Sequence, residues 1–386
     1  MVSTWVRFPW VAHIFDISMN DINKLFFELI RVSIGVSGCL SKTPTNAEWK
    51  TLYDIAKKQS LVGVCFVGVQ KLALQEQMPE EMLYLTWMGM AAKIQQRNET
   101  INKQCVELQD RLLKEGFRSC ILKGQGNAEN YGSLALIRQS GDIDIWLEGG
   151  YEKVMAWVQK VAPTREVNQH HAHFDCFPDT EVEVHYYPFV LNNPFKNRVL
   201  RKFFSQSEST QFSNHVSLLD GSTIVAADNS FNLVFQLVHI FHHLFTEGIG
   251  LRQLMDYYFV LRTLYDSTNQ LRNKNENVLR VVSDLGLNRF ASALMWVLCE
   301  VFGMEERDML CKPNEKDGRF LLHEIMLAGN FGHHDERLPK NMSYWKSFWY
   351  LNFHNLRLIR FDYWSWFWTP IMRVKGFVWR KINGYK

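Results

Sequence analysis

A change of hydrophobic pattern near residue 118 most constrains how this chain can fold. From residue 20 to about residue 110, apolar residues recur at the spacing of one helix face. Between Arg118 and about Val225 the pattern changes to short apolar runs separated by Gly, Asn and Asp, which indicates strands with intervening helices. Helical spacing returns from Ser230 onward. We therefore expect an α/β core set between two helical regions.

The boundaries of these parts follow from the same pattern. We expect three regions: an N-terminal helical region over 1–110, a core over 111–225, and a C-terminal helical region over 226–386. The core is predicted to contain strands at 119–122, 143–147, 171–177 and 181–186, with a helix at 151–161. The flanks are predicted to contain a helix starting at Thr45 or Asn46 and helices at 99–116, 231–246, 251–265 and 277–302.

Composition excludes several classes of protein. With 47% hydrophobic and 22% charged residues, a chain of 386 residues can fill the cores of two or three domains, and its net charge of +3 is too small for nucleic-acid binding by the whole chain. Seven scattered cysteines without Cys-x-x-Cys spacing favour a reduced, cytoplasmic location. We expect neither a spanning helix nor, in residues 1–18, a signal peptide.

Two aspartates one residue apart begin the second predicted strand. Successive side chains of a strand leave opposite faces, so Asp142 and Asp144 share one face while Ile143 and Ile145 point into a core. Paired carboxylates of this kind can hold one or two Mg²⁺ ions for phosphoryl transfer. Because such pairs also arise by chance, the interpretation needs further groups nearby.

The segment 180–186 offers a third carboxylate. It alternates polar and apolar residues, so Glu181, Glu183 and His185 are expected on one face. Glu183 lies between two valines and is the better anchored acid, so we predict it as a metal ligand or as the base for an acceptor hydroxyl. His185 and Glu181 are candidates for orienting these ligands.

A glycine turn follows the first predicted strand. Gly124 and Gly126 would let the backbone approach a ligand, and the residues after them can begin a helix whose N-terminus faces anions. Lys123 and Arg138 are then available to neutralise phosphates. With Gln125, these residues form the predicted nucleotide-binding set.

These motifs together resemble the polymerase-beta-type nucleotidyltransferase superfamily. Within it, the pattern Leu-Lys-Gly-Gln-Gly-Asn-Ala-x-x-Tyr at 122–131, Arg-x-x-Gly-Asp-Ile-Asp at 138–144 and Val-Glu-Val-His at 182–185 is similar to an uncharacterised bacterial branch, nucleotidyltransferase family 5. The resemblance extends to helical flanks at 26–31 and 239–256. One departure is Gln125, since the superfamily usually has Ser or Gly after the first glycine.

The resemblance implies an α+β fold, in which a short mixed sheet with helices is flanked by N- and C-terminal helical regions. It also implies an enzyme that uses Mg²⁺, or Mn²⁺, to transfer a nucleoside monophosphate from a nucleoside triphosphate to an acceptor hydroxyl of unknown identity. By motif match, Asp142, Asp144 and Glu183 would be the catalytic, metal-binding residues, and Gly124 would line the triphosphate.

Two other functions remain open from the sequence. In a metal-dependent glycosyltransferase, an Asp-x-Asp pair holds the diphosphate of a sugar nucleotide, without need of Glu183 or of the glycine turn. A non-catalytic nucleotide-binding module is the second alternative, which Gln125 makes plausible. Three converging carboxylates would favour the nucleotidyltransferase.

Several histidines invite a metal interpretation. His171 and His173 share a strand face, as zinc ligands would, but a solvated or substrate-facing strand is the simpler prediction. His239 and His243 lie four residues apart in a predicted helix and could reach the active cleft.

A neighbouring acid adds a further alternative. Together with Asp256, the two helical histidines could imitate a metal hydrolase, although hydrogen-bonding histidines in a core are favoured. Arg252 and Asp256, also four apart, are predicted as an ion pair within one helix.

The C-terminal tail is rich in aromatic and basic residues. Residues 337–386 hold ten Lys and Arg against one acid, Asp362, and six of the thirteen tryptophans lie between Trp345 and Trp379. Such a stretch over 340–386 suits peripheral contact with an anionic membrane or a lipid-linked acceptor. The other interpretation, a buried aromatic lid on the helical region, is slightly favoured.

Overall fold

A four-stranded mixed sheet lies at the centre of the fold. The structure is a computed structural model that describes residues 21–266, 272–335, 337 and 344–385. The strand order is β1-β2-β4-β3, with β2 and β4 parallel and the two outer strands antiparallel to their neighbours. This confirms the predicted α+β class with a short mixed sheet. The strands are β1 (Ser119–Ile121), β2 (Ile143–Leu147), β3 (His171–His173) and β4 (Val182–His185).

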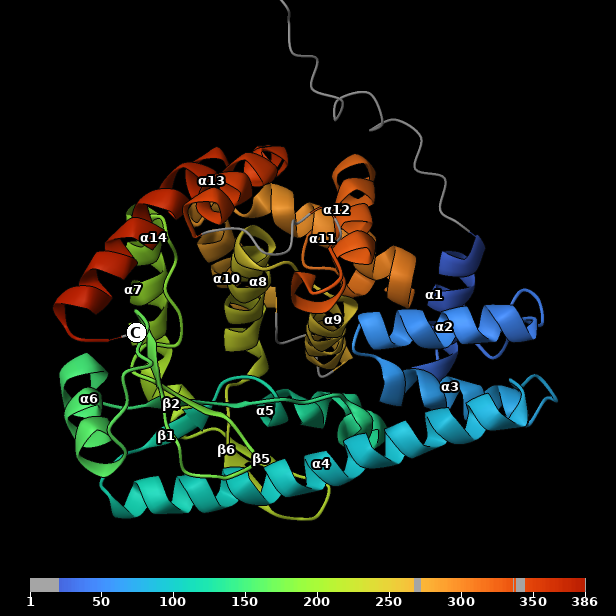
Figure 1. Cartoon of the computed structure of the whole chain (residues 1–386), viewed down its shortest axis with the longest axis horizontal. Helices are drawn as coiled ribbons and strands as arrows, with labels where there is room; N and C mark the ends of the chain where they lie inside the picture. The colour runs from blue at the N-terminus through green and yellow to red at the C-terminus, as the bar shows by residue number, and fades with distance from the viewer. Residues whose placement is uncertain (1–20, 267–271, 336, 338–343, 386) are drawn as a thin grey trace, which may run out of the picture.

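The two faces of this sheet differ in polarity because its strands alternate. Ile143, Ile145, Val182 and Val184 belong to one apolar cluster with residues of α4 (Glu81–Lys114) and α6 (Gly150–Val161). Figure 1 shows α4 running the length of the molecule beneath the sheet. The opposite face carries the acidic and histidine side chains, so the apolar face fixes which residues remain for the site.

Helix α4 is longer than the sequence analysis predicts. We expected a helix over 99–116, but the helix begins at Glu81, directly after the Pro79-Glu80 pair. Gly89 is the least favourable residue for a helix interior between these points, and a single glycine costs about 1 kcal/mol, which packing overcomes. The end is as predicted, because Gly116 adopts a positive φ of 81°.

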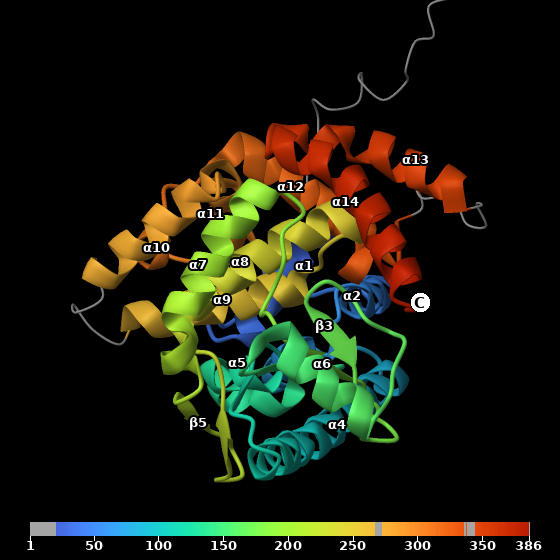
Figure 2. The ribbon, with the colours of Figure 1, turned by 90° about the vertical axis from the view of Figure 1, so that its left-hand side faces the viewer.

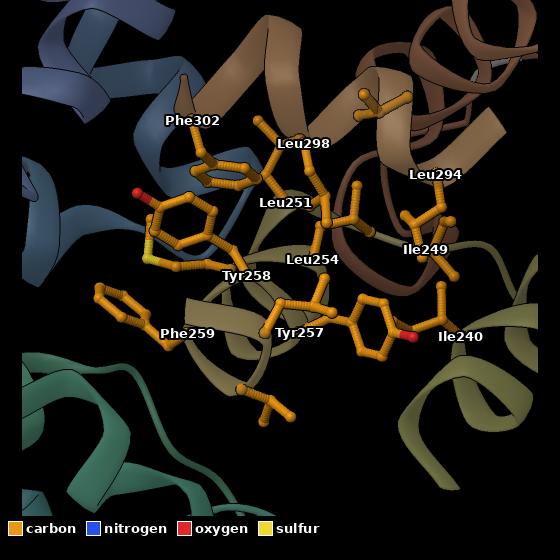
Figure 3. Close-up of a cluster of buried hydrophobic side chains, with 14 of the residues drawn as sticks. Ile240, Ile249, Leu251, Leu254, Tyr257, Tyr258, Phe259, Leu294, Leu298 and Phe302 are labelled. Atoms are coloured by element: carbon orange, nitrogen blue, oxygen red, sulfur yellow. The ribbon is translucent and has the colours of Figure 1, made fainter. Parts of the chain in front are cut away.

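The helices before and after the sheet region share one apolar core. Helix α9 (Leu251–Asp266) lies at its centre, where Tyr258 packs against Phe302 of α11 (Asn288–Phe302) and Tyr257 points toward Ile240 of α8 (Asn229–Thr246) (Figure 3). The other helices around this core are α1 (Asp21–Ser33), α2 (Asn46–Lys58), α3 (Val62–Ala73), α7 (Pro194–Gln211), α10 (Arg272–Asp284) and α12 (Glu315–Ala328).

One predicted helix is wrong in its extent. The segment 277–302 was expected to form a single helix, but α10 ends at Asp284 and α11 begins at Asn288. Gly286 adopts a φ of 65°, and the amide of Leu287 donates to the carbonyl of Val282. A left-handed glycine of this kind ends a helix, whatever the hydrophobic spacing on either side.

Two elements of the core region were not predicted. Helix α7 begins at Pro194 after Asn193, whose side chain accepts from the amides of Phe195 and Lys196. A hairpin of β5 (His215–Ser217) and β6 (Thr223–Val225) turns at Gly221, which has a φ of 83°. Both carry ordinary signals, proline at the first helical position and an Asp-Gly turn.

Residues 344–382, the last part of the C-terminal region, form two further helices along the outer edge of the helical layer (Figures 1 and 2). They are α13 (Tyr344–His354) and α14 (Tyr363–Ile382), joined by the short helix η6 (Asn355–Arg360). Ion pairs attach this region to α12: Glu324 pairs with Arg337 and Arg357 at 2.9 and 2.8 Å, and Arg360 pairs with Asp317 at 2.8 Å.

Among the described helices, none is long and apolar enough to cross a bilayer. Residues 1–18, for which no signal peptide is expected, lie outside the described residues, as do residues 338–343 at the start of the basic aromatic tail.

Candidate active site

A cavity of about 910 Å³ lies over the polar face of the sheet. Its wall combines the sheet with the loop after β1, with α8 and α9, and with the C-terminal helix α14. Figure 2 shows α8 and α14 on the same side of the sheet. Segments far apart in the sequence therefore meet around one space, whose lining includes Gly124, Asp142, Asp144, Glu183, His239 and Arg373.

Strand register brings the second predicted aspartate beside the predicted glutamate. Asp144 on β2 is the direct partner of Glu183 on β4, and His173 on β3 completes the row. One step along, Trp146, His185 and His171 form the next row on the same face. The alternation that the sequence predicts for these strands is therefore present, and it places like charges side by side.

Two cationic groups balance these carboxylates. The ammonium of Lys123 lies 2.8 Å from Asp144 Oδ1. The Nε2 atom of His185 lies 3.0 Å from Asp144 Oδ1 and 3.4 Å from Glu183 Oε2. Both residues were predicted for the site, Lys123 for phosphates and His185 as an orienting group, and the structure places both against the acids.

The charges of this cluster follow from burial and pairing. Burial alone would raise the pKa of Glu183, but the hydrogen bond from His185 and nearby positive charge outweigh it and lower the pKa to about 2. The pKa of Asp144 is also lowered, because Lys123 and His185 outweigh its burial. Burial would lower the pKa of His185, but its two carboxylate partners raise it to about 9. At neutral pH the site holds two carboxylates and two cations.

Asp142 lies just before β2, in the wall of the same cavity. Its side chain is half-buried, and its carboxylate forms no hydrogen bond or ion pair with any residue that the structure describes. A Cβ atom added to Gly124 would lie 3.6 Å from the carbonyl oxygen of Asp142, so the glycine turn borders this residue.

The glycine turn divides into two parts with different surroundings. Lys123 and Gly124 line the cavity, and Gly124 has a φ of 56°, a conformation that side chains disfavour. A Cβ atom on Gly126 would lie 3.0 Å from the carbonyl of Ile121, so this glycine serves close packing against β1. Gly126 is absent from the cavity wall as described.

The side chain of Gln125 points away from the cavity. It is buried and donates to Asn98 Oδ1 at 3.1 Å and to Asn102 Oδ1 at 2.8 Å, both on α4. Asn98 in turn donates to the carbonyls of Leu136 and Arg138. These two asparagines, which the sequence analysis missed, position the glycine turn. Contact of Gln125 and Gly126 with a nucleotide stays a prediction. Because the Gln125 side chain binds α4, only backbone atoms of these two residues are placed to make that contact.

Arg138 is held by a buried ion pair. Its Nε and Nη2 atoms donate to the two oxygens of Asp256 at 2.6 and 2.7 Å, and the hydroxyl of Tyr131 donates to Asp256 Oδ1 at 2.6 Å. Although burial would lower the pKa of Arg138, Asp256 raises it above its ordinary value. Arg138 borders the cavity, and its role toward a phosphate stays a prediction.

The expected ion pair between Arg252 and Asp256 is wrong. Asp256 binds Arg138 instead, while Arg252 Nη1 donates to the carbonyl of Gln139 at 2.9 Å. The spacing of residues along α9 could not show that Arg138, from a different segment, would pair with Asp256. The proposed hydrolase-like trio also loses Asp256, since this acid is already bound to Arg138 and Tyr131.

Histidines line two sides of the cavity. On the sheet, His171 Nδ1 lies 3.4 Å from Glu183 Oε2, and His173 Nδ1 lies 2.9 Å from Glu181 Oε1. Glu181 is mostly exposed and reaches Glu183 only through His173. On α8, His239 Nε2 lies 3.2 Å from the ammonium of Lys123, so this helix does reach the site.

Besides Arg138, the cavity wall holds arginines that the sequence analysis did not assign to the site. Arg252 on α9 and both Arg373 and Arg380 on α14 contribute to the wall. The two α14 residues lie in the basic aromatic tail, whose composition signals positive charge but not where the chain will place it.

Comparison with known families supports one of the classes left open above. A sequence model of the family described as "Uncharacterised nucleotidyltransferase" matches residues 45–303. The chain belongs to this nucleotidyltransferase family. No curated protein and no solved structure matches the chain. The match confirms the resemblance found in the sequence, and it includes the whole sheet, the glycine turn and the histidines of α8.

Membership bears on function only at the level of class. A nucleotidyltransferase family implies a nucleoside triphosphate as substrate and a transferase activity, and the groups that could hold a metal in the described chain all include Glu183 or His185. All such groups therefore involve β4.

The buried pair between Arg138 and Asp256 should dominate stability near the cavity. Asp256→Asn leaves a buried guanidinium without its counter-charge, and we expect the free energy of unfolding to fall by about 3–5 kcal/mol. Glu315→Gln is the control, because its pair with Arg319 is exposed and should contribute less than about 1 kcal/mol. Urea unfolding measures both, and an Asp256→Asn loss as small as the control would contradict the assignment.

The histidines of α8 should make stability depend on pH. Burial, together with the charge of neighbouring His243, lowers the pKa of His242 to about 3. The unfolded chain, with an ordinary pKa of about 6.5, then binds the proton more readily. Stability from His242 is therefore complete above about pH 6.5 and lost as the pH falls, by about 1.4 kcal/mol per unit. Urea unfolding between pH 6 and pH 4 should show a shallower slope for His242→Gln, and equal slopes would refute this.

Proposed function

We propose that this chain is a magnesium-dependent nucleotidyltransferase, which moves a nucleoside monophosphate from a nucleoside triphosphate to an acceptor hydroxyl. The observation that supports it best is the pairing of Asp144 with Glu183 on neighbouring strands, in a cavity that Asp142 and Gly124 also line. Family membership supplies the reaction class. The geometry supplies residues of the right chemistry for it.

The donor atoms of the site fit a hard divalent cation. One ligand atom each from Asp144, Glu183 and His185 lies within 4.8 Å of the others. Both carboxylates are ionised at neutral pH, and carboxylate oxygens are the ligands that Mg²⁺ prefers. Mn²⁺ also takes carboxylate ligands and would suit the same two acids. In this proposal Asp142, Asp144 and Glu183 hold the metal, which stabilises the charge of the transferred phosphoryl group when bound.

Of the two roles predicted for Glu183, ligand is favoured over base. A carboxylate whose pKa lies near 2 holds a proton poorly at neutral pH, so it would accept one from a hydroxyl inefficiently. It remains negative, as a cation ligand must. His185 bridges Glu183 and Asp144 and would keep both oriented, while Glu181 acts at one remove through His173.

The cationic residues of the wall suit a triphosphate. Lys123 lies beside the acids, and the backbone of Gly124 is open to close approach. Arg138 is already paired with Asp256, so we propose Arg252 as the next residue that neutralises the negative charge of the phosphates. The Nε atom of Arg252 is buried and has no hydrogen-bond partner among the described residues, which fits a group that binds a ligand.

The acceptor would enter from the side of α8 and α14. Burial and the charge of Lys123 keep the pKa of His239 well below its ordinary value, so this imidazole is neutral and would hydrogen-bond an acceptor hydroxyl without taking its proton. A lipid-linked molecule is one candidate acceptor, whereas peripheral contact of residues 340–386 with an anionic membrane does not depend on this reaction. A cytoplasmic location stays a prediction.

The glycosyltransferase alternative is less well supported. That chemistry needs only the Asp-x-Asp pair, and it gives no reason for Glu183 to be the register partner of Asp144. A non-catalytic module would bind nucleotide without turnover. Release of labelled pyrophosphate from a triphosphate, in the presence of candidate acceptors, separates a transferase from such a module.

Metal-dependent nucleotide binding should need the acids of the site. Asp142→Asn is the cleanest variant, because this carboxylate has no partner to lose within the described structure. It should weaken Mg²⁺-dependent triphosphate binding, and Asp142→Asn with Asp144→Asn should abolish it. Isothermal titration measures the affinity, and circular dichroism checks the fold.

Glu148→Gln provides the matched control for these variants. Glu148 follows the opposite end of β2 and pairs with exposed Arg118, so its loss should leave the affinity unchanged. Unchanged affinity in the double variant would count against the whole assignment.

Substrate should stabilise the fold only with metal. A triphosphate present at 100 times its dissociation constant adds about 2.7 kcal/mol to the free energy of unfolding. Thermal unfolding with each of the four triphosphates and Mg²⁺ should show such a gain for at least one base, and a chelator should remove it. Equal gains with and without chelator would refute a metal-dependent site.

A further inference from the structure

Helix α14 has two faces of opposite character. Six large apolar residues recur every three or four positions and are 39–79% exposed within the described structure. At 100° per residue, these positions fall within an arc of about 80° on one side of the helix. We call this set the outer stripe: Trp364, Phe367, Ile371, Val374, Val378 and Ile382.

The opposite face of α14 is buried or faces the cavity. Ser365, Thr369 and Gly376 are buried, and Arg373 and Arg380 line the cavity wall. Several contacts fix this face inward.

The contacts that hold this face of α14 inward come from the segments around residues 169 and 192–196. The hydroxyl of Thr369 lies 3.2 Å from Asn192 Nδ2, and Asp362, which caps the helix, pairs with Lys196 at 2.7 Å. A Cβ atom on Gly376 would lie 3.2 Å from the side chain of Gln169. With this side fixed, the outer stripe cannot turn inward without rebuilding the wall of the cavity.

The charged residues that border the outer stripe are all basic. Between Tyr363 and Tyr385 there is no acid, while Lys375 and Lys381 are exposed at the borders of the stripe. Positive charge beside an apolar stripe that begins with tryptophan and phenylalanine is typical of a helix that lies in the headgroup layer of a bilayer. The absence of a spanning helix among the described residues agrees with contact at the surface.

We propose that the outer stripe of α14 docks on an anionic lipid bilayer. The apolar side chains would enter the boundary between headgroups and acyl chains, and the two lysines would contact lipid phosphates. A second copy of the chain is the less favoured occupant, because pairing two such stripes would bring their lysines together without any acid to balance them.

Docking would bring the cavity close to the lipid. The stripe and the cavity wall are opposite faces of one helix, so about 10 Å separates them. This consequence, unlike the docking itself, depends on the proposed function: the acceptor hydroxyl would then belong to a molecule held at the bilayer surface.

Vesicle sedimentation with the full chain tests the docking. Vesicles of phosphatidylcholine with phosphatidylglycerol should sediment the protein, and vesicles of phosphatidylcholine alone should do so weakly. Phe367→Ser with Ile371→Ser should abolish binding. The control is Met82→Ser with Leu113→Ser, two more exposed apolar residues on α4, and this variant should bind as the native chain does.

A variant without the two lysines tests the electrostatic part of the binding. Each lysine at an anionic surface contributes roughly a fivefold factor, so Lys375→Gln with Lys381→Gln should weaken partitioning about 25-fold. Sedimentation needs no turnover, so its result is independent of the nucleotidyltransferase proposal.

Three results would overturn the docking. They are no sedimentation of the native chain, equal sedimentation of the stripe and control variants, or a dimer in analytical ultracentrifugation that the stripe variants dissociate. The last would make a second copy the occupant of the stripe.

Discussion

The parallel pairing of β2 with β4 is the interaction on which the site depends. It holds Asp144 and Glu183 opposite each other, although two ionised carboxylates in a buried setting repel. Lys123 and His185 offset this repulsion in the protein itself. A site that concentrates negative charge and balances it with nearby cations is suited to exchange part of that balance for a divalent ion.

The apolar face of the sheet makes this pairing robust. Because side chains alternate, a slip of β4 by one residue would turn Val182 and Val184 toward the cavity and Glu183 toward α4. The register is therefore set by packing on the far side of the sheet. The alternation of side chains along β4 therefore serves both the packing of the sheet and the position of Glu183. Helix α4 contributes to both, because it covers the apolar face of the sheet and carries the asparagines that hold Gln125.

Local patterns allowed the sequence to predict the sheet and its acids. Alternation in 143–147 and 181–186 shows which residues share a face, and the glycine turn shows where backbone can approach a ligand. What it could not predict depends on contacts between distant segments. Nothing near Asp256 indicates that Arg138 will occupy it, and the basic tail does not reveal that Arg373 enters the cavity. The helix break at Gly286 and the Asp220-Gly221 turn carried local signals that the hydrophobic periodicity around them obscured.

The central claim is that a divalent cation binds between Asp144 and Glu183 next to Gly124. Anomalous scattering from Mn²⁺ tests it most directly, in crystals grown with a triphosphate analogue that cannot be cleaved. We expect a Mn²⁺ peak within coordination distance of both carboxylates, with the analogue's phosphates beside the glycine turn. A peak confined to His171 and His173, or phosphates bound away from Gly124, would contradict the account.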